Sequence, residues 1–195
     1  MDSKKSTFQY ISAETIQTIN VIKRSIYLSM NGILAERLEE EGLHYKKNYG
    51  VIFIRLREIA RQHQPNAQLS KLLWTSQERE QMIISTMLQP INETSKEEVY
   101  ERMKLVQNPE LAEQISFNLL RHLPYAEQLA TELVDSNTPW YILTGLLLIP
   151  RICQQFTITQ KNIFENKIQP FLNAENNIIK NAANNALLHL EETTI

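Results

Sequence analysis

The chain has little cysteine, little glycine and no long apolar run. Cys153 is the single cysteine among 195 residues, so the sequence offers neither a disulfide framework nor a cysteine-based metal site. Four glycines and seven prolines are too few for a turn-rich β protein. The longest apolar stretch, from Gly145 to Pro150, is far too short to cross a membrane. These absences favour a helical protein without a membrane partner.

Motifs for phosphate cradling and for nucleophilic catalysis are also missing. The chain has no GxxxxGK[ST], GxGxxG or GxSxG pattern. Its four histidines are scattered and lack the paired spacing of a zinc site. We therefore expect no cofactor and no metal.

Charge excludes a protein that binds nucleic acid by bulk attraction, because the formal net charge is -2. The basic residues are nevertheless unevenly placed. Between His44 and Gln64 only one acid, Glu58, accompanies five basic residues. These five are Lys46, Lys47, Arg55, Arg57 and Arg61. A local basic face on a nearly neutral body is therefore expected.

The polar stretch from Met1 to Thr7 has no apolar core after it, so we expect a cytoplasmic protein without a secretory signal.

Apolar residues recur at spacings of three and four along almost the whole chain, as in Thr15 to Met30. Together with helix-start signals, this pattern predicts roughly eleven helices joined by short turns. The start signals are Ser12, Asn108-Pro109, Thr138-Pro139 and two expected capping boxes, Thr75 with Glu78 and Ser95 with Glu98. Because each helix has one apolar stripe, stacked antiparallel pairs would share a core. We predict an all-α, HEAT-like α-solenoid forming a single domain over residues 8–191, with loose ends at 1–7 and 192–195.

The loop from Gly42 to Val51 separates two of the expected helices and combines two tyrosines with two lysines. Aromatic and cationic side chains beside a helix N-terminus suit a polyanion backbone. The same tyrosines could instead pack beneath the next helix pair. The sequence leaves both interpretations open.

Two further features are candidates for a site. Glu110 and Glu113 lie three residues apart, on one helical face, where two solvated acids would also suit a helix N-terminus. Trp140 follows Pro139 at the first turn of a helix, where it either packs inward or lines a concave face.

These residues resemble a known family. The stretch from Tyr45 to Val51, the helix from Ile54 to Ala60, and Leu73-Trp74 followed by Glu78-Arg79-Glu80 are similar to the DNA alkylation repair family of HEAT-like-repeat alkylpurine DNA glycosylases. The resemblance spans residues 30–190, and is stronger in the first half. It implies antiparallel HEAT-like or ARM-type helix pairs in a right-handed superhelix, whose concave basic face holds duplex DNA by its backbone. It assigns DNA contacts to Lys46, Lys47, Arg55, Arg57 and Trp140.

The family's catalytic group is an aspartate that stabilises the sugar cation as an alkylated purine leaves, among tryptophans and with an arginine. In this chain Glu113 stands at the aspartate position, and Pro109 and Leu143 replace a tryptophan and the arginine. The last tryptophan position falls near Asn185. The resemblance therefore implies a protein that binds duplex DNA with weak or lost N-glycosylase activity. If the protein is active, it would hydrolyse the N-glycosidic bond of alkylpurines.

The alternative is a protein-interaction scaffold of the HEAT-repeat type, with a protein partner in place of double-stranded DNA. The concave face separates the two hypotheses. DNA binding requires the lysine and arginine side chains to be gathered there, whereas a scaffold would present an apolar or acidic face.

Overall fold

The computed structural model describes residues 11–192, and within them every regular element is helical. The eleven α-helices are α1 (Ala13–Leu28), α2 (Gly32–Glu40), α3 (Phe53–Ala60), α4 (Ala67–Thr75), α5 (Arg79–Leu88), α6 (Lys96–Met103), α7 (Pro109–Asn118), α8 (Ala126–Val134), α9 (Pro139–Ile152), α10 (Ile158–Ile168) and α11 (Asn177–Glu192). Four short 3-10 segments follow α5, α7, α9 and α10: Ile91–Glu93, Leu120–His122, Cys153–Gln155 and Gln169–Phe171. The predicted all-α class is confirmed.

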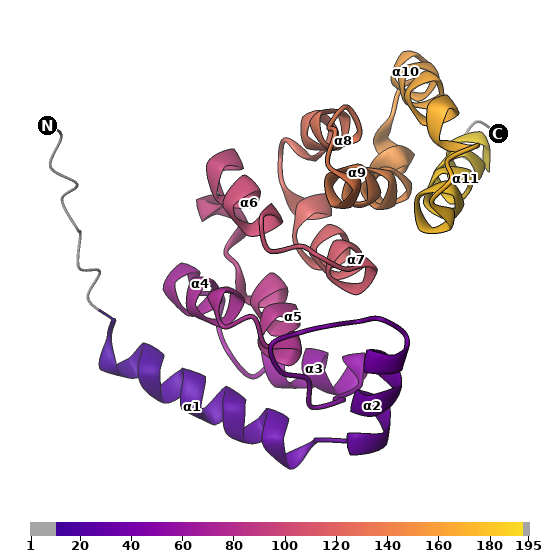
Figure 1. Cartoon of the computed structure of the whole chain (residues 1–195). Helices are drawn as coiled ribbons and strands as arrows, with labels where there is room; N and C mark the ends of the chain where they lie inside the picture. The colour runs from indigo at the N-terminus through magenta and orange to yellow at the C-terminus, as the bar shows by residue number, and fades with distance from the viewer. Residues whose placement is uncertain (1–10, 193–195) are drawn as a thin grey trace, which may run out of the picture.

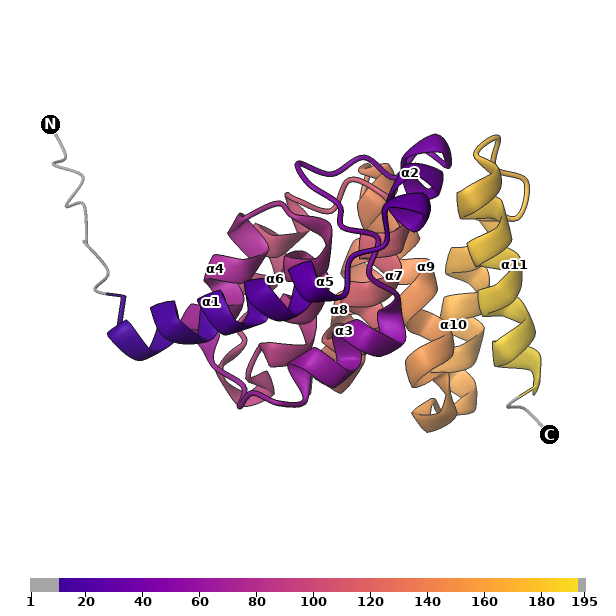
Figure 2. The ribbon, with the colours of Figure 1, turned by 90° about the horizontal axis from the view of Figure 1, so that it is seen from below.

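The helices form two rows of a bent array (Figure 1). Helices α3, α5, α7, α9 and α11 pack one on the next along the inner, concave side, and α4, α6, α8 and α10 lie along the outer side. Turning the molecule shows α1 extending from one end of the array, with α10 and α11 at the other (Figure 2). The predicted pairing of neighbouring helices holds for α4 with α5, α8 with α9 and α10 with α11, whereas α2 and α6 pack only loosely on the other helices.

Side-chain caps begin most of the helices, although Glu98 does not complete the capping box predicted with Ser95 and Thr138 makes no side-chain cap at α9. The hydroxyl of Ser12, the amide oxygen of Asn108 and the hydroxyl of Ser95 each accept a hydrogen bond from the backbone N–H three residues later. Each cap satisfies a donor that the helix itself leaves unpaired. A reciprocal capping box forms between Thr157 and Gln160 at the start of α10.

The capping box expected at Thr75 and Glu78 is wrong. Thr75 is the last residue of α4, and Glu78, the N-cap of α5, makes no side-chain cap bond. The chain turns at Gln77, which has a φ of 58°. The first N–H of α5, on Arg79, instead donates to the carbonyl oxygen of Lys47 at 2.9 Å. A distant loop therefore caps this helix, which no local pattern could indicate.

The core is densest at α5, where nine of ten residues are buried. Arg102 of α6 reaches into this region and donates to Ser85 Oγ, Ser70 Oγ and Gln89 Oε1 at 2.9, 2.9 and 2.6 Å. These bonds join α4, α5 and α6 through one buried guanidinium. By contrast α2 has no buried residue, so the array is weakest at its N-terminal end.

The predicted loose ends fall almost entirely outside the described residues. Within them, α11 continues to Glu192. The single-domain boundary at 8–191 therefore remains a prediction at its first residues.

Candidate functional site

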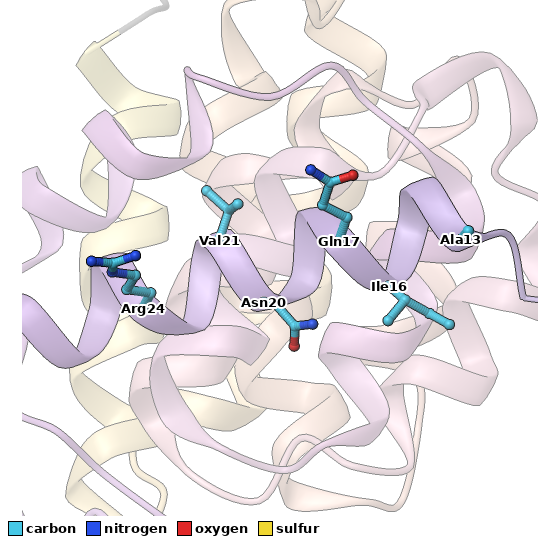
Figure 3. A pocket seen from close by; sticks show the side chains of 6 residues that line it. All are labelled: Ala13, Ile16, Gln17, Asn20, Val21 and Arg24. Atoms are coloured by element: carbon cyan, nitrogen blue, oxygen red, sulfur yellow. The ribbon is translucent and has the colours of Figure 1, made fainter.

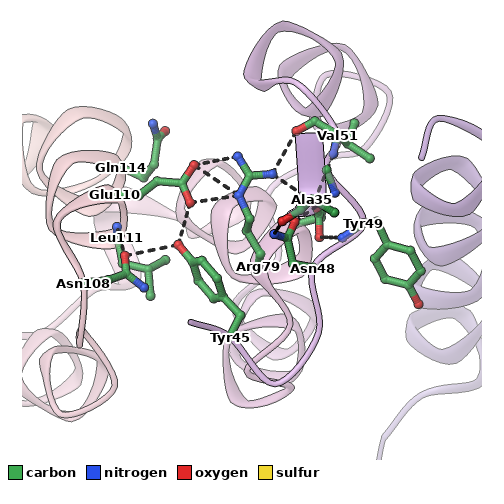
Figure 4. A network of polar contacts seen from close by, with 12 residues as sticks. Ala35, Tyr45, Asn48, Tyr49, Val51, Arg79, Asn108, Glu110, Leu111 and Gln114 are labelled. Atoms are coloured by element: carbon green, nitrogen blue, oxygen red, sulfur yellow. Dashed lines mark hydrogen bonds and ion pairs between the residues drawn. The ribbon is translucent and has the colours of Figure 1, made fainter. Parts of the chain in front are cut away.

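The loop between α2 and α3 is fixed by one arginine of α5. Arg79 donates to both carboxylate oxygens of Glu110, with Nη2 2.6 Å from Oε1 and Nε 2.9 Å from Oε2. Its Nη1 donates to the carbonyl oxygen of Val51 at 3.0 Å and lies 2.9 Å from Glu80 Oε1. Figure 4 shows this guanidinium between Glu110 and the loop. Bidentate pairing of this kind gives a strong and directional link.

Both loop tyrosines take part in the same network. The hydroxyl of Tyr45 donates to Glu110 Oε2 at 2.6 Å, and burial and the carboxylate of Glu110 raise its pKa strongly. The fully buried carboxylate of Glu80 accepts the backbone N–H groups of Tyr49 and Val51 at 3.1 and 3.2 Å. Of the two interpretations of this loop, the structure supports packing for Tyr45 and Tyr49. Glu110 is fully engaged and is not a free acid.

The loop lysines remain available. Lys46 and Lys47 are exposed, although their backbones bond to α5 through Gln77 and Arg79. The ammonium of Lys47 lies 4.6 Å from the ring centre of Tyr49. A rigid backbone thus presents two cations at the edge of the array, as a phosphate-binding loop would require.

Arg55 and Arg57 do not share a face with each other. Arg55 Nε donates to Ser29 Oγ at 3.1 Å, towards the end of α1, and its Nη1 lies 2.9 Å from Glu58 Oε2. Arg57 follows two residues later, about 200° around the helix. It is exposed and has no ion pair within residues 11–192. The basic run of the sequence is therefore divided between two surfaces.

Glu113 lies on the concave side of α7 and forms an ion pair with Arg151 of α9. The pair borders an open hollow of about 510 Å³. Its lining residues come from α7, α9 and α11: Pro109, Glu110, Glu113, Leu143, Leu147, Ile178, Asn181, Ala182 and Asn185. The carboxylate meets an arginine as the resemblance implies, but this arginine is Arg151, not a residue at position 143. Burial is the main cause of a lowered pKa at Arg151, and Arg121 adds to it while Glu113 opposes it.

Trp140 begins α9 and is half-buried against the core. It does not line the hollow beside Glu113, whereas Leu143 and Asn185 do. The walls of this hollow are thus aliphatic and amide groups, without the aromatic surfaces that the family resemblance implies around a lesion. A DNA contact by Trp140 stays a prediction.

A cluster that sequence reasoning missed lies one turn further along α7. The ring of Phe117 meets the ring of Phe53 edge-on at a centroid distance of 6.4 Å. The guanidinium carbon of Arg121 lies 4.1 Å from the centre of the Phe117 ring, and that of Arg151 lies 5.8 Å away. The available signal was the spacing of four from Glu113 to Phe117, which places these two along one stripe of α7, whereas Arg121 lies beyond the end of that helix.

A second hollow, of about 360 Å³, runs along the outside of α1 (Figure 3). All six side chains that line it belong to this one helix. It is a groove along a helix surface without a second wall, and no group of chemistry-bearing side chains converges on it.

Residues 11–192 contain neither a cluster of metal ligands nor a membrane-spanning helix. No three histidine, cysteine, aspartate or glutamate side chains among them are grouped as metal ligands. None of the helices in this part of the chain has the length and apolar character needed to span a membrane.

Neither a family model nor a curated protein matches this sequence. A solved structure does match, with a TM-score of 0.81 and 13% sequence identity over 90% of this chain and 76% of that one. That protein is described as one of "a new family of proteins related to the HEAT-like repeat DNA glycosylases with affinity for branched DNA structures". The chain has a HEAT-like repeat fold. The resemblance first noted on the Tyr-Lys loop and on α3 and α5 is thereby confirmed at the level of the fold.

Proposed function

We propose that this protein binds DNA, duplex or branched, on the concave side of its helical array. The observation that carries the proposal is the match of the fold, over nine-tenths of the chain, to a protein of a group with affinity for branched DNA. Sequence-independent DNA binding depends on cations that can reach phosphates.

The side-chain charges along the concave side favour DNA binding over a protein-interaction scaffold, which would present an acidic or apolar face. Its two acids on α7 are both neutralised, Glu110 by Arg79 and Glu113 by Arg151. Arg57 and Arg121 lack a carboxylate partner within the described chain. Arg57 lies on the same stripe of α3 as Phe53, four residues earlier, whose ring contacts α7. Unpaired cations therefore remain after the local acids are matched.

We further propose that N-glycosylase activity is weak or lost. A carboxylate that stabilises a sugar cation must face the position where positive charge develops. Glu113 instead faces the guanidinium of Arg151. Its neighbours in the hollow include Pro109, Leu143 and Asn185, which supply no aromatic wall. The site suits binding better than base excision.

Charge reversal tests the binding proposal. Arg57→Glu removes one phosphate contact and adds repulsion, so we expect at least a tenfold loss of affinity for duplex and three-way-junction DNA at low salt. The slope of log affinity against log salt should become shallower by about 0.9, the value for one phosphate in duplex DNA. Fluorescence anisotropy of a labelled oligonucleotide, titrated at several salt concentrations, measures both.

The matched control is Lys104→Glu, which reverses an exposed charge at the end of α6 in the outer row. It should change neither affinity nor slope. Equal losses in both variants would indicate a general charge effect and contradict the concave interface. Wild-type protein that binds no DNA at low salt would reject the function itself.

A protein-interaction scaffold is the second candidate, and a different surface favours it. Large apolar side chains on α1, α2 and α3 are exposed, among them Leu28 at 73%, Ile33 at 82% and Ile54 at 66%. Exposed apolar patches of this kind mark protein-contact surfaces. An Ile33→Ser change that abolishes a pull-down interaction while DNA affinity stays unchanged would support this candidate.

A further inference from the structure

The concave side holds one place where aromatic rings and unpaired positive charge coincide. Phe117 is half-exposed and presents its ring between Phe53 and two arginines. The guanidinium carbon of Arg121 is 4.1 Å from the centre of that ring, within the range of a cation–π contact. We call Phe53, Phe117, Arg121 and Arg151 the Phe117 cluster.

The hydrogen-bond donors of Arg121 are largely free. Its Nε donates to His122 Nε2 at 3.1 Å, and the two Nη groups form no hydrogen bond within residues 11–192. Burial, followed by the nearby charge of Arg121, lowers the pKa of His122, which favours the neutral ring that accepts this bond. The two Nη groups, which can bind phosphate oxygens in pairs, are therefore not taken up by partners within the described residues.

The two arginines are held close together with only one acid between them. Arg151 pairs with Glu113 and also lies 5.8 Å from the Phe117 ring centre. The remaining charge of Arg121 is not balanced by any carboxylate in the described chain. An uncompensated cation beside an open aromatic surface is complementary to a nucleotide, which combines a phosphate with a flat base.

We propose that the Phe117 cluster binds an unpaired nucleotide of a branched DNA, with its base against the Phe53–Phe117 rings and its phosphate at the Nη groups of Arg121. This inference rests on the proposed DNA-binding function and specifies the part of the DNA that this surface selects. A base inside a duplex has both faces stacked on its neighbours, so protein aromatic rings can stack only on a base that has left the helix. Branch points supply such bases, and a continuous duplex does not.

The test compares a three-way junction carrying unpaired nucleotides at the branch with a fully paired duplex of equal phosphate number. Phe117→Leu keeps apolar volume and removes the stacking surface. Base–aromatic stacking contributes about 1–3 kcal/mol per base, so junction affinity should fall by roughly 5- to 150-fold. Duplex affinity should stay within twofold. Phe156→Leu is the matched control, because Phe156 is also half-exposed but stacks on Phe164 of α10 at 4.8 Å.

Arg121→Gln gives a second readout that does not depend on the packing of Phe117. It should make the salt slope for the junction shallower by about 0.7, the value for one single-strand phosphate, and change the slope for the duplex less than that for the junction. Equal losses for junction and duplex, or no loss in either variant, would overturn the inference while DNA binding itself survives. Wild-type protein that binds neither DNA would instead reject the underlying function.

Discussion

At the scale of single residues, the arginine partners of Glu110 and Glu113 determine the role of each carboxylate on the concave side. Glu110 and Glu113 are three residues apart and look equivalent in sequence. In the structure Glu110 accepts a bidentate bond from buried Arg79, and Glu113 meets Arg151 at the border of an open hollow. Glu110 thus holds the loop in place, and Glu113 is the carboxylate that the family resemblance places at the catalytic position.

Glu113→Gln tests whether that carboxylate is catalytic. Because Arg151 already neutralises Glu113, we expect wild-type protein and variant to release N7-methylguanine from alkylated DNA at the same rate, close to the spontaneous one. Chromatography of released bases measures this, and circular dichroism verifies the fold. Strong release by the wild type that disappears in the variant would show that the protein is an active glycosylase and that the proposed loss of activity is wrong.

At the scale of elements, local sequence patterns predicted where most helices lie. They did not predict the long-range side-chain bonds that hold these helices together. Periodic apolar residues and the caps at Ser12 and Asn108 indicate where helices begin, since both signals act within a few residues. The bonds of Arg79 to Val51 and to Glu110 join residues 28 and 31 positions apart. A single sequence carries no signal for such pairs, and for the same reason the Phe117 cluster was missed.

The loop between α2 and α3 offers an element-scale test at Gly50. Gly50 has a φ of +67°, and an added Cβ would lie 2.1 Å from the carbonyl oxygen of Asn31. Gly50→Ala therefore combines backbone strain of about 1–3 kcal/mol with a clash against the start of α2. We expect urea denaturation to show a loss of more than about 3 kcal/mol in unfolding free energy.

Gly42→Ala is the control, because Gly42 also has a positive φ, +84°, but open space around its Cβ position. It should cost about 1–2 kcal/mol, from backbone strain alone. If both variants lose the same stability, the close approach of Gly50 to Asn31 contributes nothing, and the loop is held by Arg79 and Glu80 alone.

At the scale of the whole molecule, each helix of the array contacts mainly its neighbours, so stability should vary along the chain. Helix α5 has nine of its ten residues buried and lies between α3, α4 and α7, whereas α2 has none buried.

Native-state hydrogen exchange should therefore be slowest at the amides of α5 and fastest at those of α2, because local opening of α2 exposes little apolar surface. Mass spectrometry of peptic peptides can resolve this gradient. Uniform exchange across all helices would contradict it and indicate a single cooperative unit. Under the proposed function, α2 opens locally while the loop that carries Lys46 and Lys47 stays anchored at the start of α5 and the α5–α7–α9 centre keeps Glu113 and Phe117 in place.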